Sequence, residues 1–187
     1  KGVKKSLCIV DMPKNTYNNS RDAKKNARKI LHITKCDGVK IESNKKNYSI
    51  IKKLVDSKID VMGHIGYTPQ YEKKFKVAGY SKSDEAKLIK EAKEIERAGA
   101  FSIVLECIAS QTAKKITRLL KIPTIGIGSS RNCDGQILVT DDILGLSGFY
   151  PKFVKKYINL SKLIAKNIKK YRKEVKEGKF PKRTNSF

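Results

Sequence analysis

The sequence predicts an α/β fold built on a parallel sheet, and three observations support that prediction. Short apolar runs alternate with amphipathic segments in which apolar residues recur at helical spacing. This alternation is expected where crossover helices join parallel strands. At 187 residues, the chain is long enough to bury an apolar core. No apolar run approaches the ~18 residues of a membrane span, so we expect a soluble, cytoplasmic protein.

Six apolar runs are the predicted strands, and helices are predicted between and after them. The strands are Leu7–Val10, Gly38–Glu42, Asp60–Gly63, Phe101–Leu105, Ile122–Gly128 and Gln136–Val139. The helices are predicted to begin at Ser20, near Ile50, at Ser81, at Ser110 and at Pro151, the last being followed by a polar tail. The third helix has the clearest signals, because Ser81 and Asp84 resemble a capping box and Gly99 follows its last turn.

Composition argues against several classes of protein. The net charge of +24 raises the question of nucleic-acid binding, because clustered Lys and Arg neutralise phosphates. Only seven of the 42 basic residues are Arg, however, and the Lys residues are spread over nearly every predicted helix, as on a solvated surface. We therefore do not expect nucleic acid to be a partner. The four cysteines are far apart in sequence, which predicts free thiols rather than a zinc site or a disulfide framework.

Four ionisable residues lie at the ends of successive predicted strands. They are Asp11, Glu42, His64 and Glu106. A single polar residue at a strand end is ordinary and most often caps a loop. Four of them at the carboxyl edge of one sheet are costly to bury together unless a metal or a substrate pairs with them. The sequence therefore predicts a functional site at this edge, where the active sites of parallel α/β folds gather.

The first three strand ends suggest how an acidic ligand would be held. Asp11 and Glu42 offer hard oxygen atoms that, with water, suit Mg²⁺, although Asp11 before Pro13 is equally typical of a turn. Lys40 lies two residues before Glu42, so both side chains point to one face of the strand. A Lys on the inner face suggests a carboxylate-bearing substrate, and an ion pair with Glu42 is the structural alternative. His64 is a candidate donor to that substrate or a structural residue of a tight turn.

Glu106 is the candidate general base. It ends an otherwise apolar strand, where burial would raise the pKa of its carboxyl group toward a useful range. The alternative is a loop carboxylate paired with Lys114 or Lys115. The segment 126–130 is rich in glycine and serine but lacks the spacing of a nucleotide-binding loop, so it predicts a tight turn with an anion contact.

Several blocks of the sequence resemble the ketopantoate hydroxymethyltransferase family. The most specific is Gly63–Gln70, with the pattern Gly-His-x-Gly-x-Thr-Pro-Gln. The other matching blocks are Asp11–Pro13, Val39–Glu42, Val104–Cys107, Ile122–Gly128, Cys133–Val139 and Pro151–Phe153. They follow the family's order and extend over nearly the whole chain.

The resemblance implies a (β/α)₈ TIM-type barrel, of which the chain holds six units and lacks the two at the N-terminus. Residues 1–187 would form this single, N-terminally incomplete domain, with 151–187 as a C-terminal helical segment and tail. The implied reaction transfers a one-carbon unit from 5,10-methylenetetrahydrofolate to 3-methyl-2-oxobutanoate and gives 2-dehydropantoate for pantothenate synthesis. The implied partners are one Mg²⁺ per site, the 2-oxo acid, the folate and further copies of the chain in a homo-oligomer.

The resemblance also assigns roles to the strand-end residues. Asp11 and Glu42 match metal-site carboxylates, with Asp11 also near the substrate, while Lys40 and His64 match groups that hold the keto acid and Glu106 matches the base. The chain departs from the family in three places. An Asp-Ser pair on the missing second strand is absent, a Gly-Gly-aromatic triplet is missing before residues 76–79, and Ala109 replaces a usual Pro.

Two further hypotheses remain open at the level of sequence. A barrel of the phosphoenolpyruvate mutase or isocitrate lyase type also uses Mg²⁺ and 2-oxo acids, but its usual catalytic Cys loop is not found here. A truncated, inactive relative that binds acidic partners through Lys-rich helices would account for the +24 charge and the missing Asp.

Overall fold

The computed structural model describes residues 3–43, 47–72 and 74–187. The chain divides into two compact units, Lys1–Ile137 and Leu138–Phe187, and each is described by itself. The resemblance places Lys1 just before the third strand of the barrel, and Lys1 lies outside the described residues. The single barrel domain over 1–187 stays a prediction.

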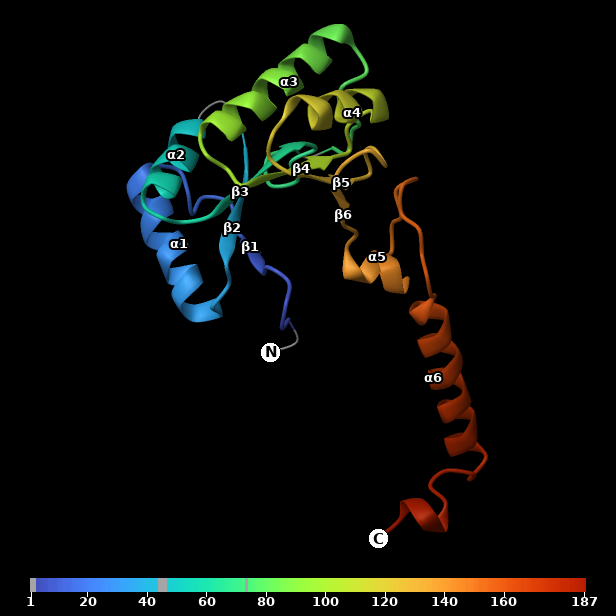
Figure 1. Cartoon of the computed structure of the whole chain (residues 1–187). Coiled ribbons are helices and arrows are strands. Elements are labelled where there is room, and N and C mark those ends of the chain that lie inside the picture. The colour runs from blue at the N-terminus through green and yellow to red at the C-terminus, as the bar shows by residue number, and fades with distance from the viewer. Residues whose placement is uncertain (1–2, 44–46, 73) are drawn as a thin grey trace. The chain divides into compact units, whose positions relative to one another are not determined.

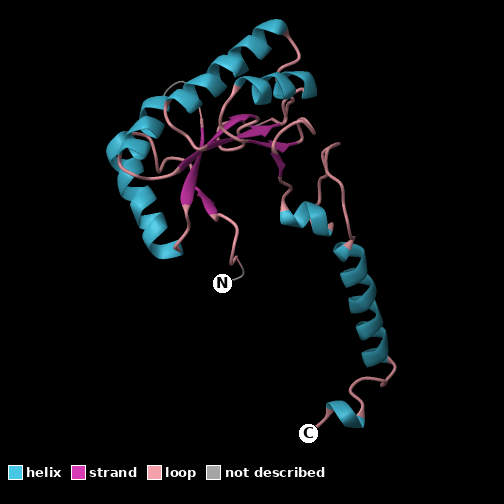
Figure 2. Ribbon diagram, in the orientation of Figure 1, coloured by secondary structure: helices cyan, strands magenta, loops and turns pink. Residues whose placement is uncertain are grey.

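The first unit is built on one sheet of six parallel strands in the order of the sequence. The strands are β1 (Ile9–Asp11), β2 (Gly38–Glu42), β3 (Val61–Gly66), β4 (Ser102–Glu106), β5 (Thr124–Ile127) and β6 (Gly135–Gln136). Each pairs with the next in parallel, and the sheet curls as part of a barrel wall does (Figure 1). Helices lie along the outer side of this curve (Figure 2). The predicted parallel α/β fold is confirmed.

Strand register separates the residues of the sheet into two faces. Paired residues share a face, so Asp11, Lys40 and Met62 lie in one row across β1 to β3, and Glu42 lies beside His64 in the next. The alternate residues form the other face, which is apolar and almost completely buried; they include Val39, Ile41, Val61, Ile65, Ile103 and Leu105. Gly63 is on this second face, where an added Cβ would collide with Ile95 of the covering helix.

Four helices cover the sheet. They are α1 (Ser20–Thr34), α2 (Tyr48–Asp56), α3 (Lys82–Arg97) and α4 (Ser110–Leu119). The Ser81 cap and the end of α3 at Gly99 are confirmed, because the Ser81 side chain accepts from the backbone N–H of Asp84 and Gly99 has a left-handed φ of +91°. The other half of the predicted capping box does not form, because the Asp84 carboxylate accepts from the backbone N–H of Gly79. The predicted start of α1 at Ser20 is confirmed, but Asn19 and not Ser20 caps the helix, because the Asn19 side chain accepts from the backbone N–H of Asp22.

Of the six predicted strands, only Gly38–Glu42 keeps its predicted bounds, and two of the differences, in β3 and β6, bear on how the strands pair. β3 continues through His64 to Gly66, because residues 65 and 66 still pair with β4. β6 is only two residues long, so the predicted strand Gln136–Val139 was wrong beyond its start. Its partner β5 ends at Ile127, and Gly128 then turns the chain with a φ of +61°, so β5 offers no partner to Leu138 and Val139.

The second unit contains α5 (Thr140–Leu144), α6 (Leu160–Lys176) and a 3₁₀ turn, Arg183–Asn185. The predicted helical start at Pro151 was wrong, because α6 begins at Leu160. Asn159 sets this start by accepting from the backbone N–H of Lys162. Among the described residues, no helix has the length and apolarity needed to cross a membrane.

Candidate active site

A continuous row of charged and polar side chains crosses four neighbouring strands at their carboxyl ends. Lys40 Nζ lies 2.6 Å from Asp11 Oδ1 and 3.3 Å from His64 Nδ1. On the other side of the same imidazole, His64 Nε2 lies 3.2 Å from Glu106 Oε2. The structure therefore brings together one residue from each of β1, β2, β3 and β4. The ion pair of Lys40 is therefore with Asp11, and the structural alternative of a Lys40–Glu42 pair is not what the structure shows.

The imidazole of His64 is enclosed between its two charged neighbours. Its side chain is 2% exposed, and the ring nitrogens face Lys40 and Glu106. Because an ammonium group offers only donors, Nδ1 must accept from Lys40, which leaves the proton on Nε2. This N–H group is close to Glu106 but makes no well-aligned hydrogen bond among the described residues. The geometry therefore orients a buried donor toward the candidate base.

Glu42 lies beside this row as a buried carboxylate. It is 3% exposed, and its Oε2 accepts the backbone N–H of Gln70 at 3.0 Å. Burial raises the pKa of this carboxyl group, and Glu106 raises it further, while His64, the Gln70 N–H and Lys40 act in the opposite direction. Glu42 is thus a carboxylate for which a nearby cation would be strongly favourable.

The backbone around Glu106 is fixed by close packing against β3. Gly66 has a φ of +96°, and a Cβ at this position would collide with the Glu106 carbonyl oxygen. That oxygen accepts the N–H of Tyr67 at 2.9 Å. The Glu106 side chain remains 18% exposed, so a substrate can reach its carboxylate. Lys115 pairs with Glu85 at 2.7 Å, so the alternative that it neutralises Glu106 is not supported.

Sequence reasoning assigned no role to Gln70 or Tyr17, which complete this edge. The Gln70 side chain donates to the Met12 carbonyl at 3.1 Å and accepts from the Tyr17 hydroxyl at 3.0 Å. Tyr17 is 2% exposed, and burial raises the pKa of its phenol, which keeps the hydroxyl protonated as a donor. The available signal was the position of Gln70 at the end of the Gly-His block; Tyr17 had none.

Asp134 joins the starts of the last two strands, and serine residues lie in the turn after β5. Asp134 accepts from the backbone N–H and the hydroxyl of Thr124, and these hydrogen bonds hold the pKa of Asp134 below its usual range. Ser130 is buried and its hydroxyl accepts from Ser110 at 3.2 Å. The Ser110–Ser130 contact and the left-handed φ of Gly128 belong to the tight turn after β5, and the anion contact there stays a prediction.

The four thiols are free, as expected. The structure does not by itself form a complete metal cage. Within residues 3–43, 47–72 and 74–187, no three His, Cys, Asp or Glu side chains are grouped as a metal site. Asp11 and Glu42 offer two carboxylates on one face of neighbouring strands, and an ion held there would complete its shell with water or substrate oxygens.

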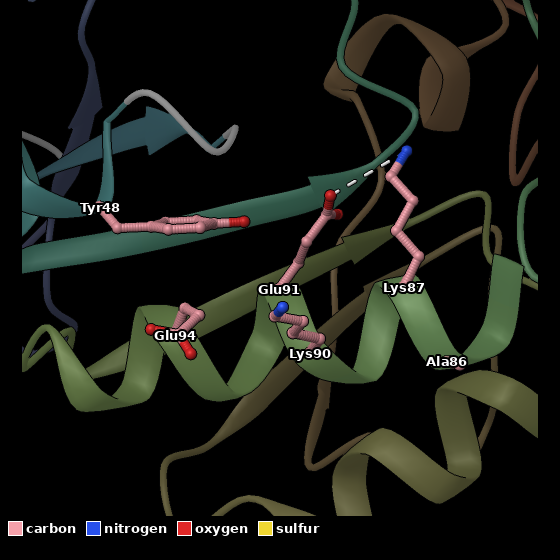
Figure 3. Close-up of a pocket in the computed structure, with 6 residues that line it drawn as sticks. All are labelled: Tyr48, Ala86, Lys87, Lys90, Glu91 and Glu94. Atoms are coloured by element: carbon pink, nitrogen blue, oxygen red, sulfur yellow. Dashed lines mark ion pairs between the residues drawn. The ribbon is translucent and has the colours of Figure 1, made fainter. Parts of the chain in front are cut away.

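A separate cavity lies against the outer helices. It has a volume of about 410 Å³ and is lined by Tyr48, Ala86, Lys87, Lys90, Glu91 and Glu94 (Figure 3). Lys87 and Glu91 are 4.0 Å apart at its wall. The Tyr48 hydroxyl is buried without a hydrogen-bond partner in the described part of the chain. None of the strand-end residues lines this cavity, so it is not the site predicted from the sequence.

Comparison with known proteins decides the family. The family model described as Ketopantoate hydroxymethyltransferase matches residues 1–183. The chain belongs to the ketopantoate hydroxymethyltransferase family. A relative from Pelagibacter ubique, named 3-methyl-2-oxobutanoate hydroxymethyltransferase, is 50% identical over 186 residues, covering 100% of this chain and 72% of that protein. One of the same name from a Thermotoga species is 45% identical over 192 residues, covering 100% of this chain and 71% of that protein.

The ketopantoate hydroxymethyltransferase family is a family of transferases, which are enzymes. A dihydrodipicolinate synthase from Agrobacterium tumefaciens superposes with a TM-score of 0.45 at 12% identity, over 73% of this chain and 48% of that one, a likeness too low to support an argument. In this family member, the Gly63–Gln70 block contributes three groups to the site. His64 belongs to the charged row, Gly66 packs against Glu106, and the backbone N–H of Gln70 donates to Glu42.

Proposed function

We propose that the protein is a 3-methyl-2-oxobutanoate hydroxymethyltransferase that uses 5,10-methylenetetrahydrofolate as the one-carbon donor and forms 2-dehydropantoate. The observation that supports this function best is the row from Asp11 to Glu106, which places an ammonium group, an imidazole and a partly exposed carboxylate side by side. A 2-oxo acid needs these groups, because it has a carboxylate to bind and an acidic C–H beside its carbonyl.

Lys40 is the group proposed to bind the oxo acid. Its side chain is 16% exposed, so the ammonium group faces the site while its stem is buried on the sheet. Asp11 holds this ammonium group from β1. His64 is also proposed to hold the keto acid. Because its ring is buried, it acts mainly by orienting Lys40 and Glu106, the two side chains that the ring contacts.

Glu106 is proposed to take the proton from C3 of the oxo acid. His64 Nε2–H stabilises the ionised carboxylate from one side, and exposure of the side chain lets the substrate approach from the other. The carbon that loses the proton then forms a bond to the methylene carbon of the folate, and both bonds from that methylene carbon to nitrogen break. One water supplies the hydroxyl group. The second proton of the water and the C3 proton, which Glu106 gives up again, go to the two folate nitrogens.

Mg²⁺ is the proposed cofactor, held by Asp11 and Glu42. The fit rests on the chemistry of these donors and on the burial of Glu42, a carboxylate whose ionisation favours a nearby cation. When bound, the ion would polarise the carbonyl of the oxo acid and so increase the acidity of C3.

We further propose that the six β/α units belong to an eight-unit barrel whose other two units come from sequence before Lys1. The other proposed partners are the folate, as co-substrate, and further copies of the protein, with which it forms a homo-oligomer. The curled six-stranded sheet and the coverage of about 70% of the relatives' length support this proposal. Mass measurement of the native gene product and its assembly would test it.

The decisive experiment mixes the protein with 3-methyl-2-oxobutanoate, methylenetetrahydrofolate and Mg²⁺, and follows 2-dehydropantoate by mass spectrometry. We expect product from the unaltered protein and almost none from Glu106→Gln. Glu174→Gln on α6 is the matched control, because it makes the same chemical change outside the first unit. Absence of product with the native full-length protein, or full activity in Glu106→Gln, would contradict the proposal. Salt-sensitive binding to acidic polymers without turnover would instead favour an inactive, binding relative.

A further inference from the structure

We propose that Gln70 and Tyr17 are positioning residues that set the separation of the Asp11 and Glu42 carboxylates. This inference rests on the proposed function, in which these two carboxylates bind Mg²⁺. Gln70 and Tyr17 would not touch the ion or the substrate. They would act by fixing the backbone and side chains that do.

Gln70 contacts the ends of two strands from the loop that follows a third. Its backbone N–H donates to Glu42 Oε2 at 3.0 Å, at the end of β2. Its side-chain NH₂ group donates to the carbonyl of Met12, the residue that directly follows Asp11 and β1. One residue after β3 therefore links the chain beside both carboxylates.

Tyr17 fixes the orientation of the Gln70 amide. Its hydroxyl donates to Gln70 Oε1 at 3.0 Å, which leaves the NH₂ end of the amide directed at Met12. Tyr17 is 2% exposed and Met12 is fully buried, so both anchors are held by packing. Met12 also donates its backbone N–H to the Lys40 carbonyl at 3.0 Å, which ties the same residue to β2.

The resulting unit has every polar end of the Gln70 side chain occupied. It is neutral, so it adds no charge beside two carboxylates and a Lys that already interact. Mg²⁺ tolerates little departure from octahedral geometry, so the side chains that bind it must be held in fixed positions. Residues that orient such ligands typically alter metal affinity by ~10–100-fold when they are removed. The Gln70–Tyr17 pair has the connections that this role requires.

Two substitutions test the pair while leaving Asp11 and Glu42 in place. Gln70→Met keeps the size of the side chain and the backbone N–H to Glu42 but removes both side-chain hydrogen bonds. Tyr17→Phe removes only the hydroxyl that orients the amide. The matched controls are Gln111→Met on the exposed side of α4 and Tyr80→Phe, whose side chain is 80% exposed.

The primary measurement is Mg²⁺ affinity by calorimetry, in the native protein without substrate. We expect the dissociation constant to rise about tenfold or more in Gln70→Met and about fivefold in Tyr17→Phe, the equivalent of one hydrogen bond. The controls should leave it unchanged. Melting temperatures with and without Mg²⁺ give a second readout, and the stabilisation by Mg²⁺ should shrink in the two variants but not in the controls.

Each outcome distinguishes this inference from the function on which it rests. If the unaltered protein binds no Mg²⁺, the proposed metal site fails, and the positioning role fails with it. If the protein binds Mg²⁺ and both variants bind it equally well, only the positioning role is overturned. An equal fall in melting temperature with and without Mg²⁺, at unchanged affinity, likewise overturns it by showing a purely structural role. If Gln70→Met does not fold, the milder Tyr17→Phe still decides the question.

Discussion

The two faces of the parallel sheet use neighbouring residues of the same strands for opposite purposes. On the outer face, Ile41 and Leu105 are fully buried in the apolar core beneath the helices. On the inner face, the adjacent residues Glu42 and Glu106 belong to a connected set of charged groups. Side chains alternate along a strand, so a residue that packs in the core is followed directly by one that faces the candidate site. Substitutions at adjacent positions should therefore have different consequences.

The largest expected effect is on the inner face, in Glu106→Gln. Loss of the carboxylate removes the proposed base, so kcat should fall by about 10²–10⁴-fold. The free energy of unfolding should change little, because the side chain is partly exposed and the amide has the same shape. Initial rates and urea unfolding of the same preparation measure both quantities. A fall in activity that merely follows unfolding would contradict the separation of the two faces.

The neighbouring residue on the outer face should give the reverse result. Leu105→Ala leaves a cavity in a fully buried position, so the free energy of unfolding should fall by about 2–5 kcal/mol. The specific activity of the folded fraction should stay near that of the unaltered protein. Urea unfolding and rates at a temperature below the transition check this. Wild-type stability in this variant would contradict tight packing around Leu105.

Lys40→Met should weaken binding of the oxo acid. Because a charged hydrogen bond contributes roughly 1.5–3 kcal/mol, KM should rise by about 10–100-fold. Loss of the ammonium group also leaves Asp11 without its partner at 2.6 Å. Lys52→Met is the control, since this exposed Lys pairs with Asp56 of its own helix. Steady-state kinetics distinguish the two variants, and an unchanged KM in Lys40→Met would remove Lys40 from the substrate site.

The smallest expected effect is the pH dependence of stability caused by Glu42. Burial raises its pKa in the folded protein above the ordinary value of 4.5, so the protonated form is favoured by folding. This stabilising contribution is complete below pH 4.5 and is lost as the pH rises through the raised pKa. Without Mg²⁺, Glu42→Gln should therefore gain stability relative to the unaltered protein over that rise. Urea unfolding across the pH range measures this, and a constant difference would contradict the shift.

Much of the fold followed from local patterns. The strand Gly38–Glu42 and the capped helix after Ser81 were predicted with their observed starts, because apolar runs and capping residues act over a few positions. Predictions failed where a neighbouring segment decides. β3 lengthens because β4 offers it partners, and β6 does not extend to Val139 because β5 ends at Ile127. The start of α6 depends on Asn159 rather than on Pro151.

The sequence by itself determined which chemical groups stand at the strand ends, because strand periodicity fixes the face on which a residue such as Lys40 or Glu106 lies. Only the tertiary structure decided which groups pair. His64 could have faced a substrate or a turn, and curvature of the sheet placed its ring between Lys40 and Glu106. Gln70 reaches Met12 across 58 positions of sequence, a contact that no local pattern encodes. Contacts of this kind depend on how strands and loops pack, which is a property of the whole sheet.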